Sequence, residues 1–141
     1  MHRPRPRTVV LGLAIALGIG AACHDPVRTD FFKQYTLVAV GDQRLPAQLS
    51  GVGAAPATTL LYGELRFSGD ARYWRNEQYA PEGLQWPTTT VSDSGTYTIR
   101  SDTLRLVAPN DATLLGKFAD DSVLLATPRG VFHYQRLRPV G

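Results

Sequence analysis

Apolar and polar residues alternate with a period of two along much of the chain from Gln34 onwards. The alternation is clearest over residues 61–67, where Leu61, Leu65 and Phe67 share one face of an extended segment and the opposite face is polar. The same pattern recurs over residues 96–100 and 104–106, and no segment beyond Gln34 has a helical period. Such alternation is typical of strands with one buried face and one wet face. We therefore predict an all-β protein.

Short connections rich in Gly, Ser, Asn and Asp separate the alternating runs. The predicted strands are residues 34–40, 44–49, 59–68, 71–79, 86–92, 95–100, 103–108, 112–119, 121–127 and 131–137. The predicted turns include 68–71, 92–95, 101–102, 110–111 and 120–121, where these residue types tolerate the required backbone angles. Short connections make consecutive strands antiparallel, so we expect an antiparallel meander closed into a small barrel, with a β-sandwich as the alternative.

The large apolar side chains of these strands are numerous enough to fill a small barrel. The candidates for the inner face are Leu61, Leu65, Phe67, Tyr97, Ile99, Leu104, Leu106, Phe118, Phe132 and Tyr134. A barrel filled by these side chains would have a solid core and no cavity for a ligand.

The N-terminus has the three parts of a secretory signal. Arginines at positions 3, 5 and 7 precede an apolar stretch of eleven residues, 9–19, and small residues follow at 20–22. That stretch is too short for a membrane-spanning helix, which needs about 20 apolar residues. We therefore expect residues 1–22 to be a signal peptide.

The segment from Ile19 to Cys23 resembles the lipobox of bacterial lipoproteins. The resemblance implies cleavage before Cys23, attachment of a diacylglyceryl group to its thiol and acylation of its new amine. Gly20 stands where the lipobox prefers leucine, and ordinary cleavage after Ala22 is the alternative. An exported chain with one cysteine has no internal disulfide partner for it, which favours lipidation.

Removal of residues 1–22 also changes the charge of the protein. Three of the 15 basic residues lie there and none of the 12 acidic ones, so residues 23–141 carry 12 charges of each sign. A neutral domain lacks the basic surface of a nucleic-acid-binding protein. We expect no nucleic-acid partner.

Four acidic residues recur nine positions apart, at Asp93, Asp102, Asp111 and Asp120. Each falls in a predicted turn, and successive turns of a meander lie at opposite ends of the strands. The four carboxylates therefore cannot share an ion, and we expect no metal and no cofactor.

One histidine, His133, falls in the predicted barrel, since His2 and His24 precede it. If the aromatic neighbours Phe132 and Tyr134 face inwards, His133 faces solvent. No nucleophile elbow, phosphate-binding loop or metal-ligand spacing accompanies it. We therefore expect no enzymatic activity.

The strand predicted at residues 71–79 mixes aromatic and charged side chains on both faces. Tyr73, Arg75, Glu77 and Tyr79 share one face; Arg72, Trp74, Asn76 and Gln78 share the other. If the first set points inwards, an Arg75–Glu77 pair between two tyrosines could line a pocket for a polar or amphipathic ligand. The alternative is an edge or exposed strand. The next loop carries Trp86, which could close the barrel mouth or form a protein-binding patch; packing on the barrel rim is the more common outcome and is the one we expect. The candidate binding residues are Tyr73, Trp74, Arg75, Glu77, Tyr79 and Trp86.

Several segments together resemble small bacterial envelope lipoproteins with a lipocalin-like barrel. They are residues 35–41 with Leu45-Pro46, residues 63–67, the hairpin 95–106 and residues 132–136. The resemblance implies a tether at 23–33, a barrel at 34–141 and anchoring in the cell envelope, in the outer membrane facing the periplasm; a secreted or soluble periplasmic protein is the alternative. It also implies a barrel that binds a small amphipathic or apolar molecule. The second hypothesis is a solid-cored structural module that binds an envelope protein.

Overall fold

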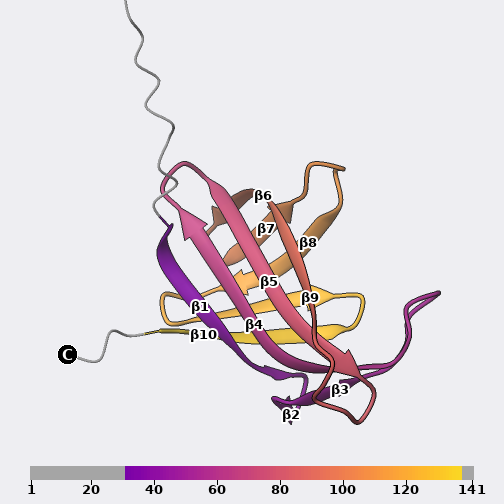
Figure 1. Ribbon diagram of the computed structural model, residues 1–141. Helices are drawn as coiled ribbons and strands as arrows, with labels where there is room; N and C mark the ends of the chain where they lie inside the picture. The colour runs from indigo at the N-terminus through magenta and orange to yellow at the C-terminus, as the bar shows by residue number, and fades with distance from the viewer. Residues whose placement is uncertain (1–30, 138–141) are drawn as a thin grey trace, which may run out of the picture.

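The computed structural model describes residues 31–137, which form strands and connections without a helix (Figure 1). The strands are β1 (Phe31–Val40), β2 (Gln43–Arg44), β3 (Ala47–Leu49), β4 (Thr58–Ser68), β5 (Arg72–Pro81), β6 (Thr89–Arg100), β7 (Thr103–Val107), β8 (Thr113–Phe118), β9 (Ser122–Thr127) and β10 (Gly130–Arg136). No helix in this part of the chain could therefore cross a membrane.

The strands form one antiparallel sheet in the order β2-β1-β10-β9-β8-β7-β6-β5-β4-β3. Pairing between β1 and β4 closes the sheet, with Tyr35 opposite Leu65. β1 and β4 to β10 therefore make an eight-stranded barrel, to which β2 and β3 are short additions. The predicted barrel is confirmed, and the sandwich alternative is wrong because the β1–β4 ladder leaves a single closed sheet.

The predicted turn at 92–95 is wrong, since these residues lie inside β6. Asp93 pairs with Arg75 and Gly95 with Tyr73, so the segment is extended and hydrogen-bonded to β5. Gly95 is needed for close approach, because a Cβ there would lie 2.0 Å from the carbonyl oxygen of Val107. Glycine in a strand often marks such an approach.

Two further boundaries differ from the prediction. β1 begins at Phe31, so the end of the predicted tether belongs to the barrel wall. The strand predicted at 44–49 is divided into β2 and β3 around Pro46, which has no backbone N–H to give to a ladder.

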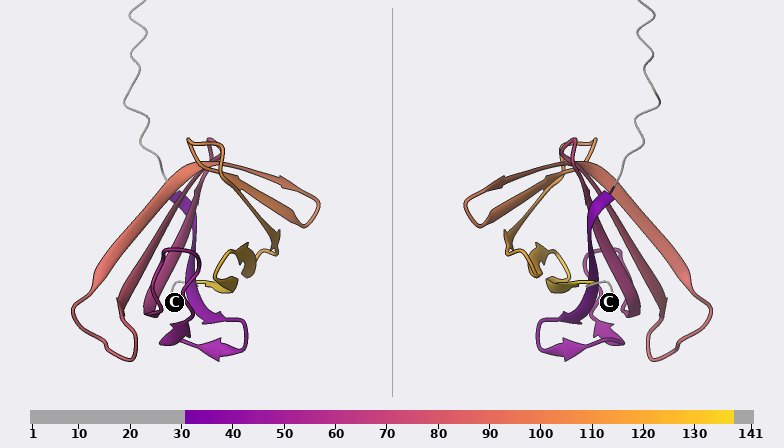
Figure 2. Two further views of the ribbon diagram at one scale, coloured as in Figure 1. Left: turned by 90° about the vertical axis from the view of Figure 1, so that its right-hand side faces the viewer. Right: turned by 90° about the vertical axis from the view of Figure 1, so that its left-hand side faces the viewer.

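Aromatic side chains fill one end of the barrel. The Phe67 ring lies edge-on to Tyr35, Tyr97 and Phe118, with ring centroids 5.8, 4.8 and 5.9 Å apart. The Tyr35 hydroxyl donates to the Asp120 carbonyl, and the Tyr97 hydroxyl donates to the carbonyl at the end of β4. We call this the closed end. The strands converge at the end where β1 begins and spread apart towards the other (Figure 2).

Most of the predicted inner face is correct. Leu65, Phe67, Leu104, Leu106, Phe132 and Tyr134 are buried, and Tyr97 and Phe118 pack partly buried against them. Ile99 is 37% exposed and does not belong to the core. A bulge between Leu60 and Tyr62 shifts the alternation, so Leu60 is fully buried and Leu61 only half-buried.

Candidate ligand-binding site at the open end of the barrel

Two adjoining cavities lie at the end of the barrel opposite the aromatic cluster. The inner cavity has a volume of about 310 Å³ and is lined by Arg75, Glu77, Tyr79, Arg129 and Phe132, among others. The outer pocket, about 560 Å³, is lined largely by apolar residues from the start of β4, the end of β5 and the start of β6. Tyr79 and Arg129 line both spaces. We call this the open end.

The inward face of β5 supplies the polar groups of this site. Tyr73 and Glu77 are buried, at 2% and 4% exposure, and alternate residues of a strand share a face. β5 is hydrogen-bonded along its length to β4 on one side and β6 on the other. Of the two alternatives for this strand, the structure has the one in which Arg75 and Glu77 face the interior, and the edge-strand alternative is wrong.

A chain of charged and phenolic groups runs along this interior face. Arg75 lies between two carboxylates, with Nη1 3.4 Å from Glu77 Oε1 and Nη2 3.6 Å from Asp93 Oδ2. The Tyr79 hydroxyl donates to Glu77 Oε2 at 3.1 Å, and the Tyr73 hydroxyl donates to Asp93 Oδ2 at 2.9 Å. The two tyrosines thus hold the carboxylates on either side of one arginine.

Three buried polar atoms in this region have no hydrogen-bond partner: Arg75 Nε, Glu77 Oε1 and Arg129 Nε. A buried polar atom without a partner costs about 1–3 kcal/mol, because its hydration is not replaced. Burial raises the pKa of Glu77, while Arg75 and the Tyr79 hydroxyl oppose that rise. Burial, with the Glu77 charge, also raises the pKa of Tyr79. The polar groups of the site are therefore desolvated, and some of their atoms lack hydrogen-bond partners.

Arg129 reaches the cavities from the connection between β9 and β10. Its Nη2 donates to the carbonyl oxygens of Pro56 and Ser50, at 3.0 and 3.3 Å. Its guanidinium lies 5.6 Å from the centroid of the Tyr79 ring, within range of a cation–π interaction. Among the carboxylates of residues 31–137, none forms an ion pair with Arg129.

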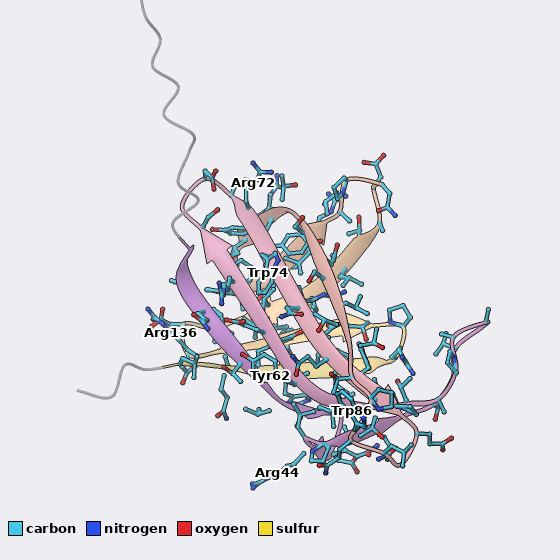
Figure 3. The ribbon with its side chains drawn as sticks, in the orientation of Figure 1. Arg44, Tyr62, Arg72, Trp74, Trp86 and Arg136 are labelled. Atoms are coloured by element: carbon cyan, nitrogen blue, oxygen red, sulfur yellow. The ribbon has the colours of Figure 1, made fainter. Side chains whose placement is uncertain are left out.

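The structure brings together some of the predicted binding residues and separates others. Arg75, Glu77 and Tyr79 line the inner cavity, and Tyr73 supports it through Asp93. Trp74 lies on the opposite face of β5, on the outside of the barrel, where the Arg66 guanidinium is 4.9 Å from its ring. Figure 3 shows Trp74 along the wall and Trp86 beside the open end.

Trp86 is 76% exposed and does not line either cavity. The expectation that it packs on the barrel rim is therefore wrong. Its neighbour Pro87 lines the outer pocket instead.

Two residues of the site were not predicted from the sequence. The Ser and Gly residues around Asp93 predict a turn there. Arg129 follows Pro128 and precedes Gly130, a pattern that predicts a turn and says nothing of what its side chain reaches. Neither residue carries a local signal for a cavity.

The chain's one histidine in the described region, His133, is half-buried in β10 opposite Leu124. No group of three or more His, Cys, Asp or Glu side chains within residues 31–137 could hold a metal ion. Cys23 lies outside the described residues.

The fold and the site thus define a closed antiparallel barrel with a charged, desolvated cavity at one end. No family model matches the chain, and no match was found among curated proteins or solved structures.

Proposed function

We propose that this protein holds a small amphipathic molecule in the open end of its barrel, and that it does so as a lipid-anchored protein of the bacterial cell envelope. The observation that supports binding is a cavity lined by Glu77 and Arg129, which have buried polar atoms without a hydrogen-bond partner, beside a pocket lined largely by apolar residues. Binding sites for small molecules have volumes of about 300–1,000 Å³ and combine apolar walls with a few polar groups.

The two cavities match the two parts of an amphipathic ligand. The outer pocket offers Pro56, Ala57, Ala80 and Val91 to an apolar group, whose burial gains about 25 cal/mol for each Å² removed from water. The inner cavity is lined by Glu77 and Arg129, each of which has one buried polar atom without a hydrogen-bond partner in the protein. A polar head in the inner cavity would offset their desolvation. The role proposed is binding without a reaction.

The anchor would place the cavities away from the membrane. Phe31, the first residue of β1, pairs with Ser68 beside the β4–β5 turn, at the closed end of the barrel. Residues 24–30 separate Cys23 from β1 and can span at most about 25 Å. A lipid on Cys23 would therefore hold the closed end near the bilayer and leave the open end facing the aqueous compartment.

The binding proposal is tested by isolating the full-length protein from its own membranes in mild detergent. Native mass spectrometry should show a stoichiometric small molecule, released by organic solvent. The Glu77→Gln and Arg129→Gln variants should retain less of it, whereas Lys117→Gln, on the outer surface, should retain the same amount. Empty preparations in several mild detergents would contradict the proposal.

The anchor needs a separate test. Metabolic labelling with a palmitate analogue should label the full-length chain but not Cys23→Ser. Equal labelling of the two chains would rule out lipidation at Cys23.

A second candidate function is a contact with another envelope protein, and the exposed loop after β5 favours it. Trp86 is 76% and Leu84 53% exposed on this loop, an unusual placement for large apolar side chains. Trp86→Ala should then weaken a cross-linked complex in intact cells while the stability of the protein is unchanged. Unaltered cross-linking would remove the basis for this candidate.

A further inference from the structure

Two residues that line the inner cavity each have a buried polar atom without a hydrogen-bond partner, and the two atoms are of opposite character. Glu77 Oε1 belongs to a carboxylate that is 4% exposed, and Arg129 Nε belongs to a guanidinium without a carboxylate partner in the described chain. The first can only accept a hydrogen bond when the carboxylate is ionised, and the second can only donate one. Both residues line the same cavity. A ligand that satisfies both must offer a donor and an acceptor.

The charges around the cavity point to the same requirement. Arg75 and Arg129 are balanced by Glu77 and Asp93, so the four side chains carry no net charge. A ligand with one charge would leave a net charge in a desolvated site, which is costly unless it is paired. A ligand with one positive and one negative group leaves the balance unchanged and gives Arg129, which has no carboxylate partner among residues 31–137, an opposite charge.

The apolar wall begins where the charged groups end. Tyr79 and Arg129 line both cavities, and beyond them the outer pocket is lined by Pro56, Ala57 and Val91, among others. A head bound between Glu77 and Arg129 would therefore place an attached apolar group in the outer pocket.

We propose that the ligand has a zwitterionic head, with an ammonium group that pairs with the Glu77 carboxylate and a carboxylate that pairs with the Arg129 guanidinium, joined to an apolar group in the outer pocket. This inference rests on the proposed binding function and specifies the chemical class of the ligand. Charged groups form the stronger hydrogen bonds, so each end of the head contributes to affinity.

Calorimetric titration of the full-length protein with four ten-carbon probes tests the inference. The probes are 2-aminodecanoic acid, decanoic acid, decylamine and 1-decanol, which share an apolar chain and differ in the head. 2-Aminodecanoic acid should bind about ten-fold more tightly than decanoic acid or decylamine, since each of these lacks one of two charge-assisted hydrogen bonds.

Two variants test which protein side chains bind the head of the ligand. Glu77→Gln should reduce the advantage of 2-aminodecanoic acid over decanoic acid, and Arg129→Gln should reduce its advantage over decylamine, each to about two-fold or less. Arg105→Gln changes an exposed arginine in β7 and should leave all four affinities unaltered. If Glu77→Gln does not fold, as judged by circular dichroism, Arg129→Gln tests the inference alone, because Arg129 lies in a connection and is only half-buried.

The outcomes separate this inference from the binding function on which it rests. Equal affinity for the four probes, or tightest binding of decanoic acid or decylamine, overturns the zwitterionic head while the binding function stands. Binding of none of the probes, to a protein that already releases no molecule on extraction, overturns both.

Discussion

Replacement of Arg75 by methionine removes the cation that lies between Glu77 and Asp93 while retaining an unbranched apolar side chain. The Glu77 side chain is only 6% exposed, and its Oε1 has no hydrogen-bond partner. Removing one member of a buried ion pair costs about 3–5 kcal/mol, because the other charge stays buried without compensation. The Tyr79 hydroxyl still donates to Glu77 in the variant but cannot replace a full charge. We therefore expect a loss of about 3–5 kcal/mol in the free energy of unfolding.

The loss should depend on pH in a defined direction. Burial already raises the pKa of Glu77, and removal of the opposing Arg75 charge raises it further. A carboxyl with a raised pKa in the folded state is stabilising when protonated, so that contribution is complete at low pH and is lost as the pH rises through the folded-state pKa. In Arg75→Met, the free energy of unfolding should therefore go on falling to a higher pH than in the original chain.

Urea denaturation of the purified protein at a series of pH values measures both effects. The double variant Arg75→Met/Glu77→Gln should be more stable than Arg75→Met, because no uncompensated charge remains on Glu77. The control is Lys117→Met, which breaks an ion pair with Asp102. Both side chains are exposed, at 72% and 62%, so this variant should unfold at nearly the same urea concentration as the original chain. Equal losses in Arg75→Met and Lys117→Met, or a double variant no more stable than the single one, would refute the reasoning.

Three further predictions concern the rest of the barrel. Phe67→Ala should lower the free energy of unfolding by about 3–5 kcal/mol, because the ring is 1% exposed at the centre of the aromatic cluster; a loss below about 1 kcal/mol in denaturant titration would contradict that packing. Gly95→Ala should destabilise by about 1–3 kcal/mol, since its Cβ would meet the Val107 carbonyl oxygen at 2.0 Å; an unchanged midpoint would show that β6 and β7 are further apart. Burial raises the pKa of Tyr35 to about 12, so the stability that its neutral hydroxyl contributes is present below pH 10 and declines between pH 10 and about pH 12. In Tyr35→Phe, the free energy of unfolding should therefore depend less steeply on pH over this range. An identical slope would argue against a buried hydroxyl.

Local patterns determined most of the secondary structure. The alternation of Leu65 and Phe67 with polar neighbours predicts a strand with one buried face, and that prediction needs only the two-residue repeat of an extended chain. The same repeat places Arg75 and Glu77 on one face of a strand, whatever packs against it. The residue types gave a wrong prediction at Asp93, where a Ser-Asp-Ser-Gly segment typical of a turn is held extended by pairing with β5.

The sequence by itself therefore determined the all-β class, the approximate strands and which side chains of β5 share a face. Only the tertiary structure decided that this face is inside, because the choice depends on β4 and β6 covering both edges of β5 and on β1 closing against β4. It also decided that Asp93 and Arg129, from distant parts of the chain, meet the Arg75–Glu77 pair. Alternation fixes relations between neighbours in a strand; a cavity depends on contacts between residues far apart in the chain, which local patterns do not encode.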